Sequence, residues 1–415
     1  MDDRGAVHRP GVLDVDGGEV AWVGGPAEAP PAPPGPVVDL GGLLMPGLVN
    51  THAHTPMTLV RGAGDGLPLD RWLREAVWPL EARFTEDDVR WGMLLGCAEM
   101  LGYGVTTTCE MYLHGRTVAE AALDAGIRCV LTPGVFELPG GLTWRQALDE
   151  AGEVHAGFHG REGRLTVGLG PHSAYAVPDE GLVATARLAA ELGALVQIHV
   201  AETAAEDPAI PARLARLGVL DGAVLAAHSV WLTDGDLDLY RDHGVAVAHC
   251  PQSNGKLGSG VARVADMLAR GVRVGLGTDG PASNDNLDLW EEMRLAPLLA
   301  RAAAGDASLV PTAQALRLAT RGGAEALGLA TGSLAPGMAA DFLRLDLADP
   351  CFVPALDERE LLAHLVWAAP NRLVTDVWVG GRQVVAGGRC TTVDVEEARR
   401  QVAARARRLR APPVG

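Results

Sequence analysis

Two histidines separated by a single residue, His52 and His54, end an apolar run early in the chain. On an extended chain, side chains two positions apart point to the same face, so both imidazoles face one side. Two imidazoles on one face can chelate a metal ion. We therefore predict that this pair contributes to a metal site.

Three further polar residues end later apolar runs, each just ahead of a loop: His199, His228 and Asp279. Three imidazoles and one carboxylate suit Zn²⁺ or Fe²⁺ and leave positions for water and substrate. A metal held there lowers the pKa of bound water toward ~7 and makes hydroxide available at neutral pH. A lone histidine at a strand end is usually a hydrogen-bonded structural residue, but the ordered recurrence of these residues favours a metal site.

A carboxylate that can move protons lies in the same region. Glu202 follows His199 by three residues and can reach the site from the same loop. We predict that it carries a proton between water and substrate. Asp279 can contact the metal and also hold the proton of the water. His228 remains after the metal ligands are chosen, and we expect it to orient the water or stabilise developing charge.

The elements that must position these residues alternate along the middle of the chain. Strand-like apolar runs are separated by stretches rich in Ala, Leu and Glu, such as 85–101 and 180–192. The predicted strands are 48–50, 105–109, 129–132, 165–170, 195–199, 223–228, 245–249 and 272–278. Eight strands alternating with helices predict an α/β fold, a (β/α)8 TIM barrel, in which the chemistry lies at the carboxyl ends of the strands.

The two ends of the chain differ from this middle part. Residues 1–45 hold a short strand signal at 19–23 and a run rich in Pro and Ala at 26–36. From 332 onward, short β-rich runs are punctuated by glycines, which is typical of hairpins. We predict that 1–45 and 332–415 together form a small β-sandwich domain with a C-terminal helix, flanking a barrel at 46–331.

Composition excludes several other classes of protein. The formal net charge of −17 argues against binding nucleic acid through a basic surface. No segment approaches the ~18 apolar residues of a membrane helix, and the acidic start at 1–5 leads into no apolar signal region. The six cysteines are scattered, so most are expected to be buried small hydrophobes. We expect a cytoplasmic protein with no nucleic-acid or membrane partner.

Three motifs in this sequence resemble the amidohydrolase superfamily, and more narrowly its branch of 5'-methylthioadenosine/S-adenosylhomocysteine deaminases and related chlorohydrolases. They are PGLVNTHAH at 46–54, HVAET at 199–203 and GTDGPASN at 277–284. The resemblance covers nearly the whole chain and implies a barrel with a β-sandwich made from both chain ends. Carried over by position, it implies one metal ion bound by His52, His54, His199 and Asp279, most often zinc with iron as the alternative.

The resemblance also implies roles for residues around the metal. Glu202 and His228 match the catalytic acid/base pair, and His172, in GPHSAY at 170–175, matches a residue that hydrogen-bonds a ring nitrogen. Asn254 and Lys256 match a motif after strand seven that we expect to shape the pocket. A binuclear site bridged by a lysine from strand four is excluded, because that strand ends in Leu-Gly and Lys256 is the only lysine of the chain.

Trp72 and Glu81, nine residues apart, match a lid segment of the adenosine-type deaminases. The resemblance implies that the tryptophan packs on the base and that the glutamate binds the ribose hydroxyls. A carboxylate that accepts two hydroxyl protons suits a ribose. The alternative is a helix with Trp72 in the core and Glu81 in solvent.

One departure concerns the substrate tail. The homocysteine-binding members carry an arginine just after strand three, where this chain has Thr-Pro-Gly at 132–134, and a second one with which Arg145 is approximately in register. A carboxylate prefers a bidentate arginine, so S-adenosylhomocysteine fits less well than adenosine, 5'-methylthioadenosine or another 5'-modified adenosine. Arg145 is kept as a candidate substrate-binding residue. Glu110 stands where relatives often have Asp, which predicts a different pocket depth.

The sequence leaves three alternative functions for this chain. The first is a metal-dependent hydrolytic deaminase of an adenosine-type nucleoside, which gives the inosine-type product and ammonia. The second acts on a free base or heterocycle such as guanine, a pterin or a triazine. The third is a catalytically silent metal-binding or scaffold protein, against which Glu202, His228 and Asp279 argue. The expected partner is a small molecule, a purine nucleoside, and relatives suggest a homo-oligomer.

Overall fold

The predicted barrel is present in the computed structural model, which describes residues 6–31, 35–137 and 142–411. Within these residues eight parallel strands form one sheet, in the order β10-β11-β12-β13-β4-β5-β6-β8. The strands are β4 (Leu48–Ala53), β5 (Val105–Glu110), β6 (Arg128–Leu131), β8 (Leu165–Val167), β10 (Val196–Val200), β11 (Val224–His228), β12 (Ala246–His249) and β13 (Arg273–Leu276). Each predicted strand overlaps one of them.

The sheet closes between β8 and β10. The N–H of Leu169 donates to the carbonyl of Leu195 at 2.8 Å, and the N–H of Gln197 donates to the carbonyl of Leu169 at 3.0 Å. Closure brings the carboxyl ends of all eight strands to one end of the barrel. The predicted fold class is therefore confirmed.

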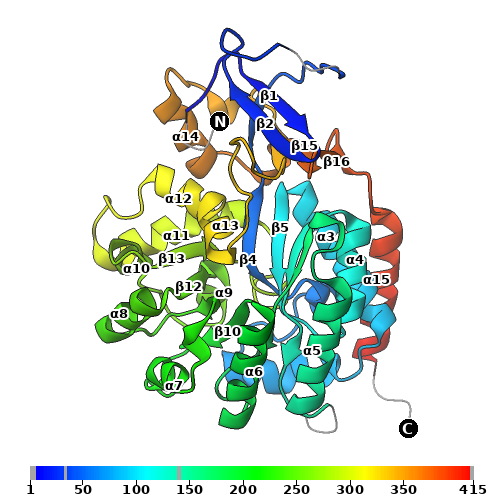
Figure 1. The fold of residues 1–415 in the computed structure, drawn as a ribbon, viewed down its shortest axis with the longest axis vertical. Helices are drawn as coiled ribbons and strands as arrows, with labels where there is room; N and C mark the ends of the chain where they lie inside the picture. The colour runs from blue at the N-terminus through cyan, green and yellow to red at the C-terminus, as the bar shows by residue number, and fades with distance from the viewer. Residues whose placement is uncertain (1–5, 32–34, 138–141, 412–415) are drawn as a thin grey trace.

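Helices surround the barrel (Figure 1), and some of them, such as α3, α5 and α8, start at a side-chain cap. At the start of α3, the Thr85 side chain accepts from the N–H of Asp88, whose carboxylate accepts from the N–H of Thr85. This reciprocal pair satisfies two N–H groups that lack partners in the first turn. The predicted helices 85–101 and 180–192 match α3 and α6. None of the helices in the described residues is long and apolar enough to span a membrane.

The helices of the barrel region are η1 (Thr55–Val60), α1 (Leu69–Arg71), η2 (Trp72–Val77), α2 (Trp78–Glu81), α3 (Glu86–Gly102), α4 (Gly115–Ala125), α5 (Trp144–Phe158), η3 (Arg161–Gly163), α6 (Asp179–Leu192), α7 (Ile210–Arg216), η4 (Val219–Asp221), α8 (Asp234–His243), α9 (Pro251–Lys256), α10 (Val264–Ala269), α11 (Leu289–Ala304), α12 (Thr312–Leu318) and α13 (Arg321–Leu327). Later helices are η5 (Pro350–Phe352), α14 (Glu358–Trp367), η6 (Asn371–Leu373) and α15 (Val395–Arg410). Two short strands, β7 (Gly134–Val135) and β9 (Gly170–Pro171), pair at the barrel rim.

A second, antiparallel sheet draws strands from both ends of the chain. In the described part of the chain it runs β17-β16-β15-β14-β3. Its members are β3 (Leu43–Pro46), β14 (Phe342–Leu345), β15 (Val374–Val379), β16 (Arg382–Ala386) and β17 (Arg389–Cys390). The hairpin of β1 (Val12–Asp16) and β2 (Glu19–Gly24) is a separate sheet that contacts the segment before β14, where the N–H of Val20 donates to the carbonyl of Met338 at 2.8 Å. Figure 1 shows β1, β2, β15 and β16 together at one end of the molecule.

Ion pairs join the barrel to the other elements. Arg128 of β6 pairs with the buried carboxylate of Asp341, just before β14, at 2.6 Å. The C-terminal helix α15 runs along α3 and reaches Asp88 through Arg408 at 2.5 Å.

The division into 1–45, 46–331 and 332–415 stays a proposal. The six cysteines are free, and Cys97, Cys109, Cys129 and Cys250 are buried as expected.

Candidate active site

The polar residues at the strand ends meet at the carboxyl end of the barrel. His52 lies in β4 and His54 directly follows it, His199 lies in β10, and His228 ends β11. Asp279 follows β13 and is held beside β4, because its N–H donates to the carbonyl of His52 at 2.9 Å. Parallel strands of a closed barrel present their ends together, so residues up to 227 positions apart become neighbours.

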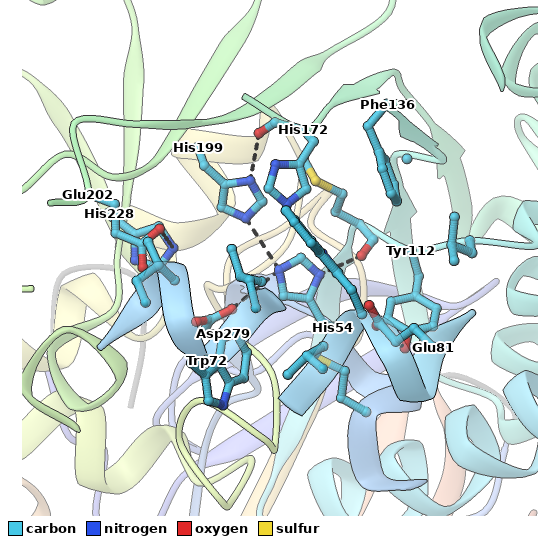
Figure 2. Close-up of a pocket in the computed structure, with 18 of the residues that line it drawn as sticks. His54, Trp72, Glu81, Tyr112, Phe136, His172, His199, Glu202, His228 and Asp279 are labelled. Carbon is cyan, nitrogen blue, oxygen red and sulfur yellow. Dashed lines mark hydrogen bonds and ion pairs between the residues drawn. The ribbon is translucent and has the colours of Figure 1, made fainter. Parts of the chain in front are cut away.

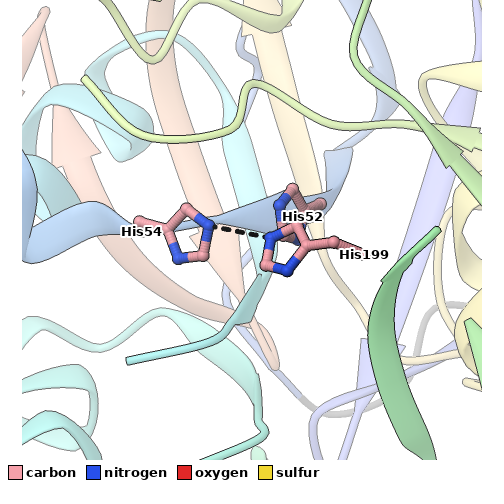
Figure 3. Close-up of side chains that lie close together, drawn as sticks. All are labelled: His52, His54 and His199. Carbon is pink, nitrogen blue, oxygen red and sulfur yellow. Dashed lines mark hydrogen bonds between the residues drawn. The ribbon is translucent and has the colours of Figure 1, made fainter. Parts of the chain in front are cut away.

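The ligand atoms of these residues form two overlapping groups of three, each close enough to hold one ion. Those of His52, His54 and His199 all lie within 4.8 Å of one another, as do those of His52, His228 and Asp279. Nε2 of His54 is 3.3 Å from Nε2 of His199 and 3.3 Å from Oδ1 of Asp279 (Figure 3 shows the three histidines). Oδ1 of Asp279 is also 3.5 Å from Nε2 of His52.

For His54 and His199, the other ring nitrogen fixes the tautomer that a metal needs. Nδ1 of His54 donates to the carbonyl of Met111 at 2.6 Å, and Nδ1 of His199 donates to the carbonyl of His172 at 2.6 Å. A carbonyl only accepts, so each Nδ1 carries the hydrogen and each Nε2 keeps its lone pair. Nε2 of His52 is buried without a hydrogen-bond partner. The donor set therefore fits a divalent metal.

The carboxylate of Asp279 divides its two oxygens between different partners. Oδ2 accepts from the hydroxyls of Ser253 at 2.6 Å and Ser283 at 2.7 Å. Oδ1 is left facing the histidines. Burial alone would raise the pKa of Asp279, but the imidazoles of His52, His54 and His228 hold it well below its usual range. The carboxylate is thus ready to bind a cation.

Burial favours the neutral form of three imidazoles at the site, those of His52, His172 and His199. It lowers the pKa of His52 to about 4 and the pKa of His172 to about 3. For His199 it lowers the pKa well below the ordinary value. A neutral imidazole is the form that binds a metal or hydrogen-bonds a neutral ring.

Glu202 and His228 lie beside the cluster. Oε2 of Glu202 is 3.7 Å from Nε2 of His228, whose Nδ1 donates to Oδ1 of Asn254 at 2.9 Å. Burial raises the pKa of Glu202 to about 7. A carboxyl with a pKa near neutrality can both accept and deliver a proton at physiological pH.

Backbone strain is concentrated at the same strand ends. His228 and Asp279 have φ of 66° and 59°, and Ala201 and Ser229 also lie in the left-handed region, at 49° and 51°. Such non-glycine conformations cost on the order of 1–3 kcal/mol each and persist where the surroundings enforce them. They turn the side chains of His228 and Asp279 toward the centre.

His54, His199, His228 and Asp279 of this cluster line a pocket (Figure 2). Glu202 and His228 lie on one side, while Glu81, Tyr112 and Phe136 lie on the opposite side. Oε1 of Glu81 accepts from the hydroxyl of Tyr112 at 2.7 Å, and burial raises the pKa of Glu81.

Trp72 and His172 line the same pocket. Nε1 of Trp72 donates to the carbonyl of Ala63 at 3.0 Å, which fixes the indole in the pocket wall. Nδ1 of His172 lies 3.1 Å from Oγ of Ser173. Much of the remaining wall is apolar: Met57, Leu69, Leu73, Val77, Trp78, Met111, Leu113, Phe136. None of the described residues that line the pocket is Arg or Lys.

The structure does not bring every candidate residue into the pocket. Arg145 is exposed on α5, and its guanidinium lies 4.1 Å from the ring centre of Trp144. Lys256 pairs with Asp285 at 2.5 Å and so joins two loops at the rim. Glu110 is fully buried at the end of β5, where it accepts from the N–H of Thr55 at 2.9 Å. Neither Glu110 nor Arg145 is among the lining residues.

Sequence reasoning missed several residues that support the site. The Glu206 carboxylate accepts from the N–H groups of Ala201, Glu202 and Thr203 at 3.2, 2.7 and 3.0 Å, and so shapes the loop that carries Glu202. The side-chain amide of Gln197 lies 2.6 Å from Nδ1 of His52. Gln197 is two positions before His199, so strand alternation could have found it. No spacing signal points to Glu206 or Tyr112.

The chain is similar to a known family over most of its length. Residues 43–384 match the amidohydrolase family. The 5-methylthioadenosine/S-adenosylhomocysteine deaminase of Pelotomaculum thermopropionicum is 41% identical, over 99% of this chain and 96% of its own length. The 5'-deoxyadenosine deaminase of Methanothermobacter thermautotrophicus is 40% identical, over 93% and 91%.

A solved structure is similar over most of the fold. An adenosine deaminase from Xanthomonas campestris with bound zinc superposes with a TM-score of 0.91 at 34% identity, covering 96% of this chain and 93% of its own. The family match spans well over half of the chain, and the resemblance of its motifs is confirmed. The chain belongs to the amidohydrolase family.

Proposed function

We propose that this protein is a zinc-dependent deaminase that converts an adenosine-type nucleoside to the inosine-type nucleoside and ammonia. The observation that carries the proposal is the form of the pocket. Three histidines and an aspartate gather at the pocket, and the half-buried carboxylate of Glu81, which accepts from a tyrosine, lines the same pocket. Two relatives that are about 40% identical to this chain are named as deaminases of such nucleosides.

His52, His54, His199 and Asp279 would hold the metal. Zinc bound there supplies a water molecule whose pKa is lowered toward neutrality. Iron is the alternative for the same donor set. Support for zinc comes from the named zinc of the similar adenosine deaminase.

Proton transfer falls to Glu202. Its pKa of about 7 lets it accept a proton from water and deliver it to the ring nitrogen next to the carbon that carries the amine. After the water oxygen bonds to that carbon, its second proton passes to the exocyclic amine, the bond between the carbon and this amine breaks, and ammonia leaves a carbonyl on the ring. His228, held by Asn254, faces Glu202 and is suited to orient the water.

The other residues bind the nucleoside. Trp72 offers its indole to the purine, and neutral His172 offers an imidazole nitrogen to the ring. The hydroxyl of Tyr112 occupies one oxygen of Glu81, so the second oxygen is open to the ribose hydroxyls. These roles make the partner a small purine nucleoside.

The apolar wall favours an uncharged 5' substituent. The described lining holds no Arg or Lys to pair with a carboxylate, and Arg145 lies on Trp144 outside it. A carboxylate buried without a partner is costly. Adenosine, 5'-deoxyadenosine and 5'-methylthioadenosine are therefore proposed as better substrates than S-adenosylhomocysteine.

Steady-state ammonia release by the zinc-loaded protein tests this proposal. The panel consists of these four nucleosides together with adenine, guanine and an aminated triazine. We expect kcat/KM for the uncharged nucleosides to exceed that for S-adenosylhomocysteine by about tenfold or more, and the free bases to be poorest. Turnover of only the free bases or the triazine would replace the nucleoside with a heterocycle as substrate.

A further inference from the structure

A buried glutamate behind the metal cluster has no place in the chemistry described above. Glu292 lies on α11 and is fully buried. Its Oε2 accepts from the backbone N–H of Gln252 at 3.0 Å, and its Oε1 accepts from the side-chain amide of Asn284 at 2.6 Å. Burying a carboxyl is costly unless its hydrogen bonds are made, so these two contacts are a strong constraint.

The two partners of Glu292 lie in different loops. Gln252 is in α9, which follows β12, and Asn284 is in the loop that follows β13. The second hydrogen of the Asn284 amide goes to the carbonyl of Thr278 at 2.7 Å, and the Gln252 side chain donates to the carbonyl of Asn284 at 3.2 Å. Glu292 therefore joins both loops to each other and to the end of the barrel strand.

Each partner is the chain neighbour of a serine that binds Asp279. Ser253 follows Gln252 and donates to Oδ2 of Asp279 at 2.6 Å, while Ser283 precedes Asn284 and donates to the same oxygen at 2.7 Å. With Oδ2 occupied twice, Oδ1 is the oxygen that faces His52 and His54.

We propose that Glu292 is a positioning residue for the metal centre. By fixing the two loops, it holds Ser253 and Ser283 on Oδ2 of Asp279 and so presents Oδ1 to the metal. The inference rests on the proposed function only in requiring the metal. Partners of metal ligands that act in this way typically contribute 10–100-fold to metal affinity.

Zinc affinity, measured by competition with a chromophoric chelator in the absence of any nucleoside, tests this role. We expect Glu292→Leu to weaken zinc binding by about 10–100-fold. Glu292→Gln keeps one acceptor oxygen and should lose less. The matched control is Glu291→Gln, since Glu291 is the next residue on α11, is exposed, and accepts from Asn286 at 2.7 Å. The control should stay within about twofold of the wild type.

A double-mutant cycle separates positioning from general stabilisation. If Glu292 acts through the serines, Glu292→Leu should cost little more zinc affinity in the Ser253→Ala/Ser283→Ala background. Equal losses in both backgrounds, or wild-type affinity in the folded Glu292→Leu variant, would overturn the proposal. If the leucine variant does not fold, Glu292→Gln is compared in the same cycle, with the same two outcomes.

The substrate does not enter this measurement. The zinc affinities could fall in the expected order, from wild type through Glu292→Gln to Glu292→Leu, while the wild type releases no ammonia from nucleosides. This result would refute the proposed function and leave the role of Glu292 standing. Deamination of nucleosides by the wild type, together with equal zinc affinity of the Glu292→Leu variant, would support the proposed function and refute the role of Glu292.

Discussion

Three carboxyls that line the pocket show how the surroundings of a single residue change its chemistry. Asp279 stays ionised because imidazoles surround it, whereas burial raises the pKa of Glu202 to about 7. Glu81 has a third environment, with one oxygen taken by Tyr112. The residue type alone does not determine the role of a carboxyl. Its neighbours determine whether it is suited to bind a metal, transfer a proton or bind a hydroxyl.

Glu81→Gln tests the binding of the ribose. Replacing the carboxylate with an amide removes a charge-assisted hydrogen bond to a ribose hydroxyl, so KM for 5'-deoxyadenosine should rise by about tenfold. A free base has no ribose, and its KM should barely change. Steady-state kinetics with both substrates measure this. An unchanged KM for the nucleoside, in a folded and zinc-loaded variant, would remove Glu81 from the binding site.

Glu202→Gln tests the raised pKa of Glu202. In the unfolded chain a glutamate ionises near pH 4.5, whereas in the metal-free folded protein Glu202 keeps its proton to about pH 7. Its favourable contribution is complete below the unfolded pKa and is lost as pH rises through about 7. The glutamine variant, which cannot ionise, should therefore gain Tm relative to metal-free wild type between pH 5 and pH 8. A difference in Tm that is independent of pH would contradict the shift.

At the scale of elements, the periodicity of apolar residues predicted the regular barrel strands and missed the short, irregular elements. The eight barrel strands were predictable because each is an apolar run that ends in a polar residue or a turn. The π-helical turn η2 and the two-residue strands β7 and β9 leave no periodic signal. The left-handed backbone of His228 and Asp279 was not predictable either, because glycine is the residue that normally marks such positions.

The supporting contacts were missed for a different reason. The bond from Glu292 to Asn284 and the bonds from Glu206 to its own loop depend on backbone geometry that no spacing rule records. Arg145 was approximately in register with a substrate arginine, yet its side chain stacks on the neighbouring Trp144. The residues proposed as metal ligands were found from strand ends, whereas the residues that contact them could be found only from the structure.

Gly277→Ala tests how closely strand β13 must approach β4. A Cβ at position 277 would come within 2.8 Å of Cβ of His52 and 3.0 Å of its backbone nitrogen. We expect the displaced His52 to weaken zinc binding by about tenfold or more. Gly157→Ala, on α5 with open space around the new Cβ, is the matched control and should stabilise the helix by about 0.5–1 kcal/mol. Unchanged zinc affinity in the Gly277 variant would show that His52 tolerates the shift.

At the scale of the whole molecule, the second sheet is tied to the barrel by a buried ion pair. Asp341 accepts from Arg128 at 2.6 Å, from the hydroxyl of Thr331 at 2.8 Å and from the N–H of Gly380 at 2.7 Å. Sequence composition predicted that both chain ends form one β-rich part. The order of the strands, with β3 next to β14, could not be predicted because long-range pairing leaves no local signal.

Asp341→Ala should destabilise the protein without disturbing the metal centre. Removing one partner of a buried pair leaves Arg128 without its carboxylate, which costs about 3 kcal/mol. Asp124→Ala is the control, because Asp124 pairs with Arg90 at 2.7 Å on the surface and such pairs contribute about 0–1 kcal/mol. Denaturant unfolding measures both, and zinc affinity should match the wild type. Equal small losses in the two variants would contradict a structural role for Asp341.

Hydrolytic removal of an amine from the purine ring is the central claim, and one reaction tests it most directly. Zinc-loaded protein is incubated with 5'-deoxyadenosine in water enriched in ¹⁸O, and both products are analysed by mass spectrometry. We predict one ammonia for each nucleoside consumed, and an inosine-type nucleoside with intact ribose that carries ¹⁸O on the ring carbon. Release of free adenine, or consumption without ammonia, would contradict the account.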